Sequence, residues 1–411
     1  MLDQSFSEKA VKLLGINTWR KFQPSTEYTN FVANTYEQVE AKFNADEYQF
    51  CQFEKKSFKG KVGWAFASAA DEIVAKKLND NIRRLFKVRP SDRHAIVKQT
   101  IALAKDSQPI TIARLDIKDF YESLDRESIV KFITEEWLLS HQNRMVLKQW
   151  DRQLASQGIR GLPRGMSLSS TLSEIRIRHF DKQMKLDSGV YFYARYVDDI
   201  IVFYTGEQSQ LKSVMKHRLE ASAKELTLNS DKSHYTVLNA PANEVSAEIN
   251  YLGYKLRIKN NSNRRGVKRK VQVFISNKKV NKVKERVRRA FRAYSKDRRY
   301  NLLLARLKFL SANQYIIGDI ERTKLKSGIY YNYPLINDHS QLKELDAFYQ
   351  NFINSGKEPA FSAMQLIKRH GGVINNKRLR QIEAISFQFG FKNRLMNSFT
   401  NDLNKKIKRC W

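Results

Sequence analysis

Two adjacent carboxylates, Asp198 and Asp199, stand between runs of aromatic and β-branched residues at 193–197 and 200–203. Such flanks favour β-strands, so the acidic pair is predicted to lie at the tip of a β-hairpin. Two like charges side by side repel each other, and a fold that holds them together usually supplies a cation. Carboxylate oxygens suit Mg²⁺, which binds one or two protein carboxylates together with substrate phosphates. The alternative is a solvated turn, because an Asp-Asp pair arises easily by chance in a chain of 411 residues.

A third carboxylate, Asp116, ends a separate apolar run that predicts a strand leading into a helix. Carboxylates from two strands can bridge two metal ions, and such a pair of ions forms a clamp for in-line phosphoryl transfer. In that chemistry one ion activates an attacking 3′-hydroxyl and the other stabilises the leaving pyrophosphate. The alternative role for Asp116 is to cap the helix that follows it.

Further segments around these acids complete an ordered set of five motifs. They are Asp116–Tyr121 (motif A), Gly161–Ser170 (motif B), Tyr196–Asp199 (motif C), Leu228–Ser233 (motif D) and Asn250–Tyr254 (motif E). In this order they resemble the palm motifs of reverse transcriptases, over roughly residues 80–260. Motif B contains Pro163-Arg164-Gly165 where many relatives carry Pro-Gln-Gly. This variant resembles bacterial abortive-infection and defence-associated enzymes of the unknown-group, retron-related kind, and implies a role in antiphage defence.

The resemblance implies an α+β, right-hand polymerase fold with fingers, an antiparallel palm sheet and a basic, all-helical thumb and C-terminal region. Residues 1–110 would form an N-terminal extension and fingers. Residues 111–260 would form the palm with the remaining fingers elements. Residues 261–411 would form a basic hairpin, a helical thumb and a C-terminal helical domain.

The resemblance also assigns the catalytic residues. Asp116, Asp198 and Asp199, with Ile117 beside the first of them, would bind two Mg²⁺ ions, for which Mn²⁺ is an alternative. Lys232 in motif D would protonate the leaving pyrophosphate or neutralise its charge. The alternative for Lys232 is a solvated surface cation.

Four residues are candidates for holding the incoming dNTP. Tyr121 stands at the family's steric gate, where a bulky ring blocks the ribose 2′-hydroxyl that distinguishes the two kinds of nucleotide; the alternative is a core aromatic. Arg93, at the spacing of the fingers, would grip the triphosphate, since Arg suits bidentate phosphate contacts. Arg164 would add a cation, and Gly165 would allow close backbone approach. The alternative for that loop is an ordinary capped turn.

Composition indicates a polyanionic partner. Lys and Arg number 74 against 42 Asp and Glu, which gives a formal net charge of +32. A membrane surface is the alternative, but no apolar run approaches the roughly 20 residues needed to span a bilayer. The first residues are polar and lack the apolar core of a signal peptide. Cys51 and Cys410 form neither a metal motif nor a disulfide framework. These features fit a cytoplasmic protein without a membrane partner.

Outside the motifs, the sequence predicts a helix over 65–85 and basic turns over 55–61 and 260–270. Within the C-terminal part, apolar residues at helical spacing mark one face of a long basic helix. They are Val280, Val283, Val287, Phe291 and Tyr294. The tyrosines of 328–334 would either stack on unpaired bases or pack as core.

These observations favour an RNA-directed DNA polymerase that copies a structured, non-coding RNA into cDNA. A scaffold that binds RNA without catalysis would have no reason to keep three aspartates and an aromatic gate together. The alternatives are a retron- or group II intron-type enzyme, a protein-primed or untemplated DNA polymerase, and that non-catalytic scaffold. The template, the priming mode and the formation of a homo-oligomer stay open.

Overall fold

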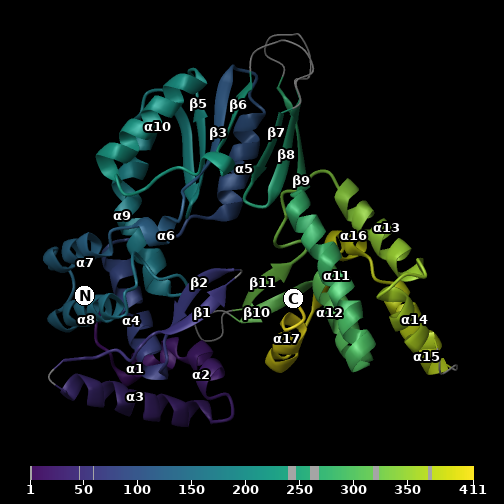
Figure 1. Ribbon diagram of the computed structural model, residues 1–411, viewed down its shortest axis with the longest axis horizontal. Helices are drawn as coiled ribbons and strands as arrows, with labels where there is room; N and C mark the ends of the chain where they lie inside the picture. The colour runs from purple at the N-terminus through teal and green to yellow at the C-terminus, as the bar shows by residue number, and fades with distance from the viewer. Residues whose placement is uncertain are drawn as a thin grey trace. The chain divides into compact units, whose positions relative to one another are not determined.

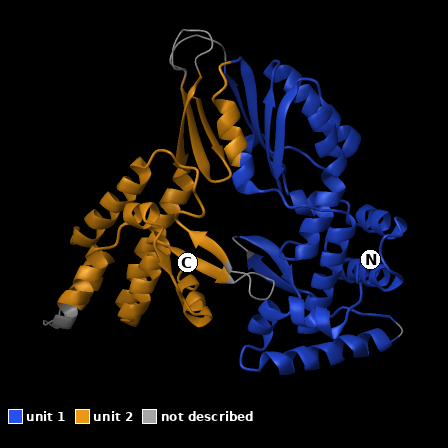
Figure 2. Ribbon diagram, turned by 180° about the vertical axis from the view of Figure 1, so that it is seen from behind, with its two compact units in different colours: residues 1–96, 108–239, 319–321 blue, residues 97–107, 240–318, 322–411 orange. Residues whose placement is uncertain are grey.

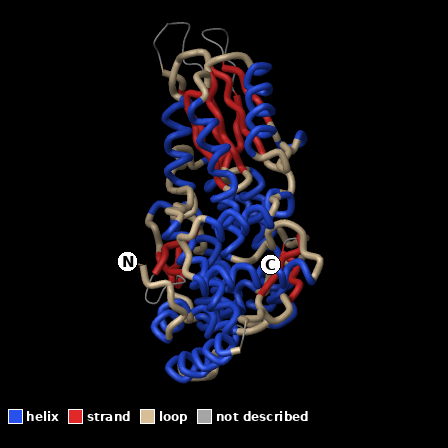
Figure 3. The backbone as a smooth tube through the Cα atoms, turned by 90° about the vertical axis from the view of Figure 1, so that its left-hand side faces the viewer, coloured by secondary structure: helices blue, strands red, loops and turns tan. Residues whose placement is uncertain are grey.

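The computed structural model describes residues 2–45, 47–58, 60–238, 247–259, 268–317, 324–368 and 373–411. Contacts divide the chain into two compact units, which are residues 1–96, 108–239 and 319–321 (unit 1) and residues 97–107, 240–318 and 322–411 (unit 2) (Figure 2). Both units mix helices with strands, in agreement with the expected α+β class (Figure 3). The predicted boundaries at 110 and 260 stay predictions. Within the described residues, no helix is long and apolar enough to cross a bilayer.

Unit 1 contains a four-stranded antiparallel sheet, as expected for a palm (Figure 1). Its strands, in the order in which they pair, are β4 (Val190–Tyr196), β5 (Asp199–Tyr204), β3 (Ile110–Asp116) and β6 (His234–Leu238). The central strands β3 and β5 are almost wholly buried, which explains their continuous apolar runs. Ala113, Leu115, Ile200 and Val202 share one hydrophobic core with the helices of unit 1.

The helices of unit 1 precede and separate these strands. They are α1 (Glu8–Leu14), α2 (Ile16–Phe22), α3 (Tyr28–Asn44), α4 (Ala69–Leu85), α6 (Phe120–Ser123), α7 (Arg126–Glu135), α8 (His141–Ser156), α9 (Ser167–Leu186), α10 (Gln208–Ser222) and the 3₁₀ turn η1 (Ser230–Lys232). Helix α5 (Arg93–Ala104) begins in unit 1 and ends in unit 2.

Two segments of unit 1 differ in detail from the sequence-based expectation. The predicted helix over 65–85 begins later, at Ala69, because the Ser68 side chain accepts a hydrogen bond from the Asp71 N–H and caps the helix there. Ala65 instead ends strand β2 (Lys61–Ala65), which pairs with β1 (Glu54–Phe58). The basic segment 55–61 is therefore largely strand and not turn.

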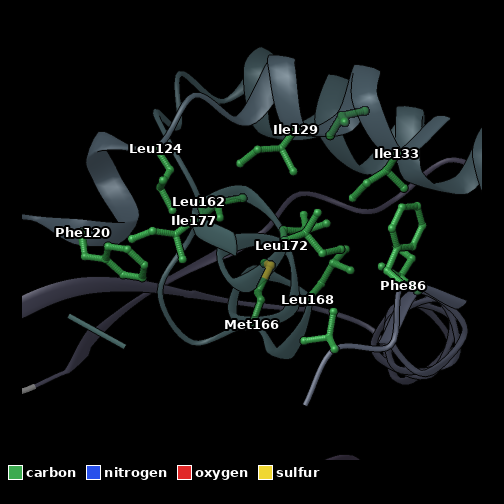
Figure 4. Packing of buried hydrophobic residues seen from close by; sticks show 14 of the residues in the cluster. Phe86, Phe120, Leu124, Ile129, Ile133, Leu162, Met166, Leu168, Leu172 and Ile177 are labelled. Atoms are coloured by element: carbon green, nitrogen blue, oxygen red, sulfur yellow. The ribbon is translucent and has the colours of Figure 1, made fainter. Parts of the chain in front are cut away.

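A hydrophobic core lies directly beneath the motif B loop. Leu162, Met166 and Leu168 pack with side chains of α6 and α7, such as Phe120 and Ile129 (Figure 4). All five are buried. Because interiors are close-packed, this core fixes the path of the loop that precedes α9.

Unit 2 begins with a three-stranded antiparallel sheet and continues with helices and a second small sheet. The first sheet consists of β7 (Ala247–Tyr251), β8 (Tyr254–Lys259) and β9 (Lys270–Ile275). The later elements are α11 (Asn277–Asp297), α12 (Tyr300–Ser311), β10 (Asn313–Ile317), β11 (Lys324–Gly328), α13 (Ser340–Asn354), α14 (Ala360–Lys368), α15 (Val373–Glu383), α16 (Phe387–Lys392), β12 (Met396–Asn397) and α17 (Asn401–Lys408).

The expected all-helical C-terminal region was wrong in one respect, since β10, β11 and β12 form a sheet within it. Strand β10 pairs antiparallel with β11 and parallel with β12, about 80 residues further on. The Asn313 side chain ties the sheet together, because it donates to the Leu395 carbonyl at 3.0 Å and accepts from the Tyr330 N–H at 2.9 Å. Because the partner strand lies so far along the chain, no local sequence pattern predicts this sheet.

Two further predictions in unit 2 concern a hairpin and a helix. Motif E forms the β7–β8 hairpin, whose turn residues Leu252 and Gly253 both have positive φ, as a tight two-residue turn requires. In α11 the predicted apolar face is buried, except that Val283 is half-buried. The predicted turn over 260–270 falls mostly on residues 260–267, which lie outside the described residues.

Candidate active site

The three aspartates lie at the ends of two neighbouring strands. Asp116 is the last residue of β3 and Asp199 the first of β5, and the two face each other in the β3–β5 register. Asp198 precedes Asp199 in the β4–β5 turn, so the acidic pair lies at a hairpin tip as predicted. The Ile117 N–H donates to the Asp198 carbonyl at 3.0 Å, which joins the end of motif A to the tip of motif C.

Basic side chains reach two of these carboxylates. Lys232, in η1, lies 3.2 Å from Asp116 Oδ2. Arg114 lies 2.7 Å from Asp199 Oδ1 and also donates to the Lys232 carbonyl at 3.0 Å. Asp116 is buried, so the Lys232 ammonium offsets a charge that water reaches poorly. Lys232 of motif D is thus beside the acid of motif A, and Arg114 links its backbone to Asp199 of motif C.

Asp198 differs electrostatically from its neighbours. Burial, followed by the adjacent carboxylates of Asp199 and Asp116, raises the pKa of Asp198 above its ordinary value. An arrangement that gathers negative charge at a half-buried position favours a bound cation there.

The hairpin tip is held in place by a buried arginine. Arg195, in β4, pairs with Glu174 at 2.7 Å and with Asp181 at 2.8 Å, both on α9. Its guanidinium also donates to the Val197 carbonyl at 2.9 Å. Val197 has a φ of 61°, a strained value for a β-branched residue. Arg195 therefore fixes the turn that carries Asp198.

Tyr121 lies beside the motif B loop. Its carbonyl accepts a hydrogen bond from the Leu162 N–H at 2.8 Å, and its half-buried side chain is hydrogen-bonded to Ser170. The Arg164 guanidinium stands over the Tyr121 ring, 5.4 Å from its centroid, and also pairs with Glu122. Tyr121 and Arg164, predicted from two motifs, thus form one cluster, and burial raises the pKa of the tyrosine hydroxyl.

Glycine is required at one position of this loop. Gly161 has a φ of +60°, and a Cβ atom there would lie 2.5 Å from the carbonyl oxygens of Tyr121 and Glu122. Gly165, predicted to allow close backbone approach, has a φ of 97°. Motif B can therefore pack against motif A only with glycine at 161.

A side chain at a left-handed φ costs roughly 1–2 kcal/mol. We expect Gly161→Ala to destabilise the protein by clearly more than this, because the backbone of Tyr121 and Glu122 must also move to make room for the Cβ atom. Gly158→Ala is the matched control, since Gly158 has a φ of +64° but a Cβ there would meet no described atom within 4 Å. Urea unfolding of both variants measures the difference. Equal losses of unfolding free energy in the two variants would show that Gly161 does not pack tightly against Tyr121.

The remaining nucleotide candidate, Arg93, is the first residue of α5, which Asp92 caps by accepting from the His94 and Ala95 N–H groups. A pocket of about 150 Å³ lies between the segment before α5, helix α9 and the hairpin tip. Ser91 and Val197 are among its lining residues. The contact of Arg93 with a triphosphate stays a prediction.

A family model described as reverse transcriptase (RNA-dependent DNA polymerase) matches residues 32–256. The chain belongs to the reverse transcriptase family. The matched residues form an RNA-dependent DNA polymerase domain and include motifs A to E, and membership implies the right-hand polymerase fold.

No curated protein matches this reverse transcriptase. Among solved structures, an apo telomerase from Candida tropicalis, truncated from its C-terminal domain, is similar at 12% identity with a TM-score of 0.35. The match covers 50% of this chain and 53% of that chain. The chain therefore spans about half the length of that telomerase chain, and a likeness this distant says nothing about its function.

Reverse transcriptases generally use divalent metal ions. Among the described residues, no three His, Cys, Asp or Glu side chains lie close enough together to hold a metal ion. The donor chemistry nevertheless fits, since Asp116 and Asp198 offer oxygen ligands, and burial together with the neighbouring carboxylates raises the pKa of Asp198. Asp199, paired with Arg114, is less available.

Two residues that act on this site were missing from the sequence-based set. Arg114 lies two residues before Asp116 in the same strand, so the period of two places both on one face of the sheet and could have identified it. Arg195 had no comparable signal, because its partners Glu174 and Asp181 lie on a helix.

Proposed function

We propose that this chain is an RNA-directed DNA polymerase that adds dNTPs to a 3′-hydroxyl. The observation that carries the proposal is the meeting of Asp116, Asp198 and Lys232 at one end of the four-stranded sheet, three residues drawn from three separate motifs. Tyr121 and Arg164 form a second cluster, and the charge of Asp198 acts on both. The aspartates, the lysine and the tyrosine proposed as a gate would thus act in one site.

Asp116 and Asp198 would hold two Mg²⁺ ions, or Mn²⁺ in their place, with Asp199 and Ile117 beside them. Bound divalent ions lower the pKa of an attacking hydroxyl and offset the charge of a leaving pyrophosphate. Lys232 is placed to supply a proton or a positive charge to the pyrophosphate, because its ammonium group is exposed and already next to Asp116.

Tyr121 is proposed as the steric gate for dNTPs. Its ring is held by Phe120 at a centroid distance of 5.3 Å and by Arg164 above it, so it has little freedom to move aside for a 2′-hydroxyl. We expect Tyr121→Ala to raise ribonucleotide incorporation relative to dNTPs by at least about tenfold, which equals about 1.4 kcal/mol. Tyr121→Phe keeps the ring and serves as the control. Unchanged sugar selectivity in Tyr121→Ala would remove the gate role.

The RNA partner is proposed on the basis of charge. In α11, exposed basic residues such as Lys278 and Arg292 lie opposite a buried apolar face, as expected for a thumb helix that follows a nucleic-acid duplex. Binding of a structured RNA to the full chain should weaken steeply between 50 and 200 mM salt, by roughly 10³-fold or more for six or more phosphate contacts. Fluorescence anisotropy over this range measures the slope, and a flat response would contradict the basic thumb.

The deciding experiment is to sequence nucleic acid that co-purifies with the protein from cells, beside an Asp198→Ala/Asp199→Ala control. A discrete RNA in both samples, with complementary DNA only in the wild type, supports a polymerase dedicated to one non-coding template. DNA unrelated to any bound RNA would favour untemplated or protein-primed synthesis. Bound RNA without DNA in either sample would favour a non-catalytic scaffold.

The finer proposal is that this synthesis serves antiphage defence in a bacterial cytoplasm. It is supported by the motif B variant, in which Arg164 replaces the common glutamine and pairs with Glu122, the residue directly after motif A. A retron- or group II intron-type enzyme is the alternative, and the sequence of the bound RNA distinguishes them. The thiols of Cys51 and Cys410 fit a reducing compartment.

A further inference from the structure

Unit 2 contains a cavity of about 300 Å³ that the polymerase site does not use. Its walls come from α11, the end of α12, the β10–β11 hairpin and the loop 329–333, elements that lie together in Figure 1. All of these belong to unit 2. A volume of this size is at the lower end of small-molecule sites and suits a single nucleotide.

Two polar atoms in the wall of this cavity are buried without a hydrogen-bond partner among the described residues. One is Oε1 of Gln314, whose side chain belongs to a residue only 4% exposed. The other is Nε of Arg286, which lines the cavity from α11. An unsatisfied buried polar group costs roughly 1–3 kcal/mol. One acceptor and one donor lining the same cavity are therefore suited to a ligand that offers both groups.

The cavity is also positively charged on one side. Lys279, Lys282 and Arg286 follow each other at helical spacing along α11 and line it, while no Asp or Glu is among the described residues in its wall. Burial lowers the pKa of Arg286, because water reaches its guanidinium poorly. The Trp411 ring lies 5.2 Å from the guanidinium and orients it. This side favours a phosphate, which Arg binds through its fork of donors.

Apart from Ser327 and Asn332, the rest of the lining is mainly apolar and aromatic. Phe309 and Ile316 contribute apolar surface, and the half-buried Tyr333 contributes a ring. Tyr254 fixes this ring by an edge-to-face contact with a centroid distance of 5.6 Å. An immobilised aromatic ring beside apolar surface suits the flat face of a base. The 328–334 loop thus supplies one half-buried tyrosine to a cavity.

We propose that this cavity binds one nucleotide, with the base against Tyr333, a base N–H donating to Gln314 Oε1, and the phosphate on Lys279, Lys282 and Arg286. The nucleotide is either free or an unpaired residue of a bound strand, since both present the same chemistry. Binding here does not depend on DNA synthesis, because no wall residue belongs to the active site.

Photolabelling of the full-length protein tests this proposal. The probes are 8-azidoadenosine 5′-monophosphate and a short single-stranded RNA that carries one 8-azidoadenosine. After irradiation, mass spectrometry maps the labelled peptides. We expect label in the peptide that contains Tyr333, reduced at least about tenfold by Gln314→Leu and by Arg286→Gln. Thermal melting of each variant confirms that it is folded.

Matched controls exist in the same unit. Gln341 also has an orphan Oε1 and Lys296 is an exposed cation of α11, but neither lines the cavity, so Gln341→Leu and Lys296→Gln should leave the label unchanged. Asp198→Ala should keep the label, which separates this site from the proposed polymerase function. Labelling by the monophosphate indicates a free nucleotide, and labelling by the RNA alone indicates an unpaired residue. No label at Tyr333, or label that persists in both folded variants, overturns the proposal.

Discussion

Asp198→Ala is expected to reduce incorporation of dNTPs by at least about 10³-fold, or roughly 4 kcal/mol of transition-state stabilisation. Burial and the neighbouring carboxylates raise the pKa of Asp198, which lies at the strained hairpin tip. A group in this setting gains most from a bound cation. Primer extension on an RNA template measures the loss.

Asp199→Ala provides an internal comparison. Asp199 is already neutralised by Arg114 at 2.7 Å, so its removal should cost less activity than the removal of Asp198. Glu220→Ala, on an exposed face of α10, is the control for a lost carboxylate and should leave extension unchanged. RNA binding should survive in all three variants. If Asp198→Ala extends the primer normally, the assignment of the site is wrong.

The acidic centre was predictable because its signals are local. The flanks of Asp198 predict strands, and the order of motifs A to E predicts which strand ends meet. Period-two alternation would also have placed Arg114 with Asp116. The strands and the place of Arg114 follow from strand geometry and spacing, whereas the motif order carries weight through the resemblance to reverse transcriptases. The β3–β5 register confirms that Asp116 faces Asp199.

Features that depend on distant partners were not predictable. Strand β10 exists because β11 and β12 pair with it, although its sequence follows directly on a helix. Gly161 is required by the carbonyl oxygens of Tyr121 and Glu122, some 40 residues earlier in the chain. The cavity in unit 2 depends on Gln314, Arg286 and Tyr333, which no sequence pattern links. Each of these features results from tertiary packing between residues that are distant in the sequence.

Arg195→Met is expected to destabilise the protein by about 3–5 kcal/mol, the usual loss when one partner of a buried ion pair is removed. The Arg195 side chain is 3% exposed and serves Glu174, Asp181 and the Val197 carbonyl together. Its loss leaves Glu174 and the strained turn without this donor, and leaves Asp181 with only the Tyr193 hydroxyl, at 2.6 Å. Urea unfolding measures the change in free energy.

Arg218→Met is the matched control, because Arg218 makes one partly exposed ion pair, with Asp187 at 3.3 Å, and should cost only about 1 kcal/mol or less. Neutralising the orphaned acids by Glu174→Gln and Asp181→Asn in the Arg195→Met background should restore much of the stability. It should not restore full polymerase activity, because the Val197 carbonyl still lacks its donor and the turn that carries Asp198 stays loose. Recovery of activity together with stability would mean that Arg195 supports the fold alone and does not position the catalytic turn.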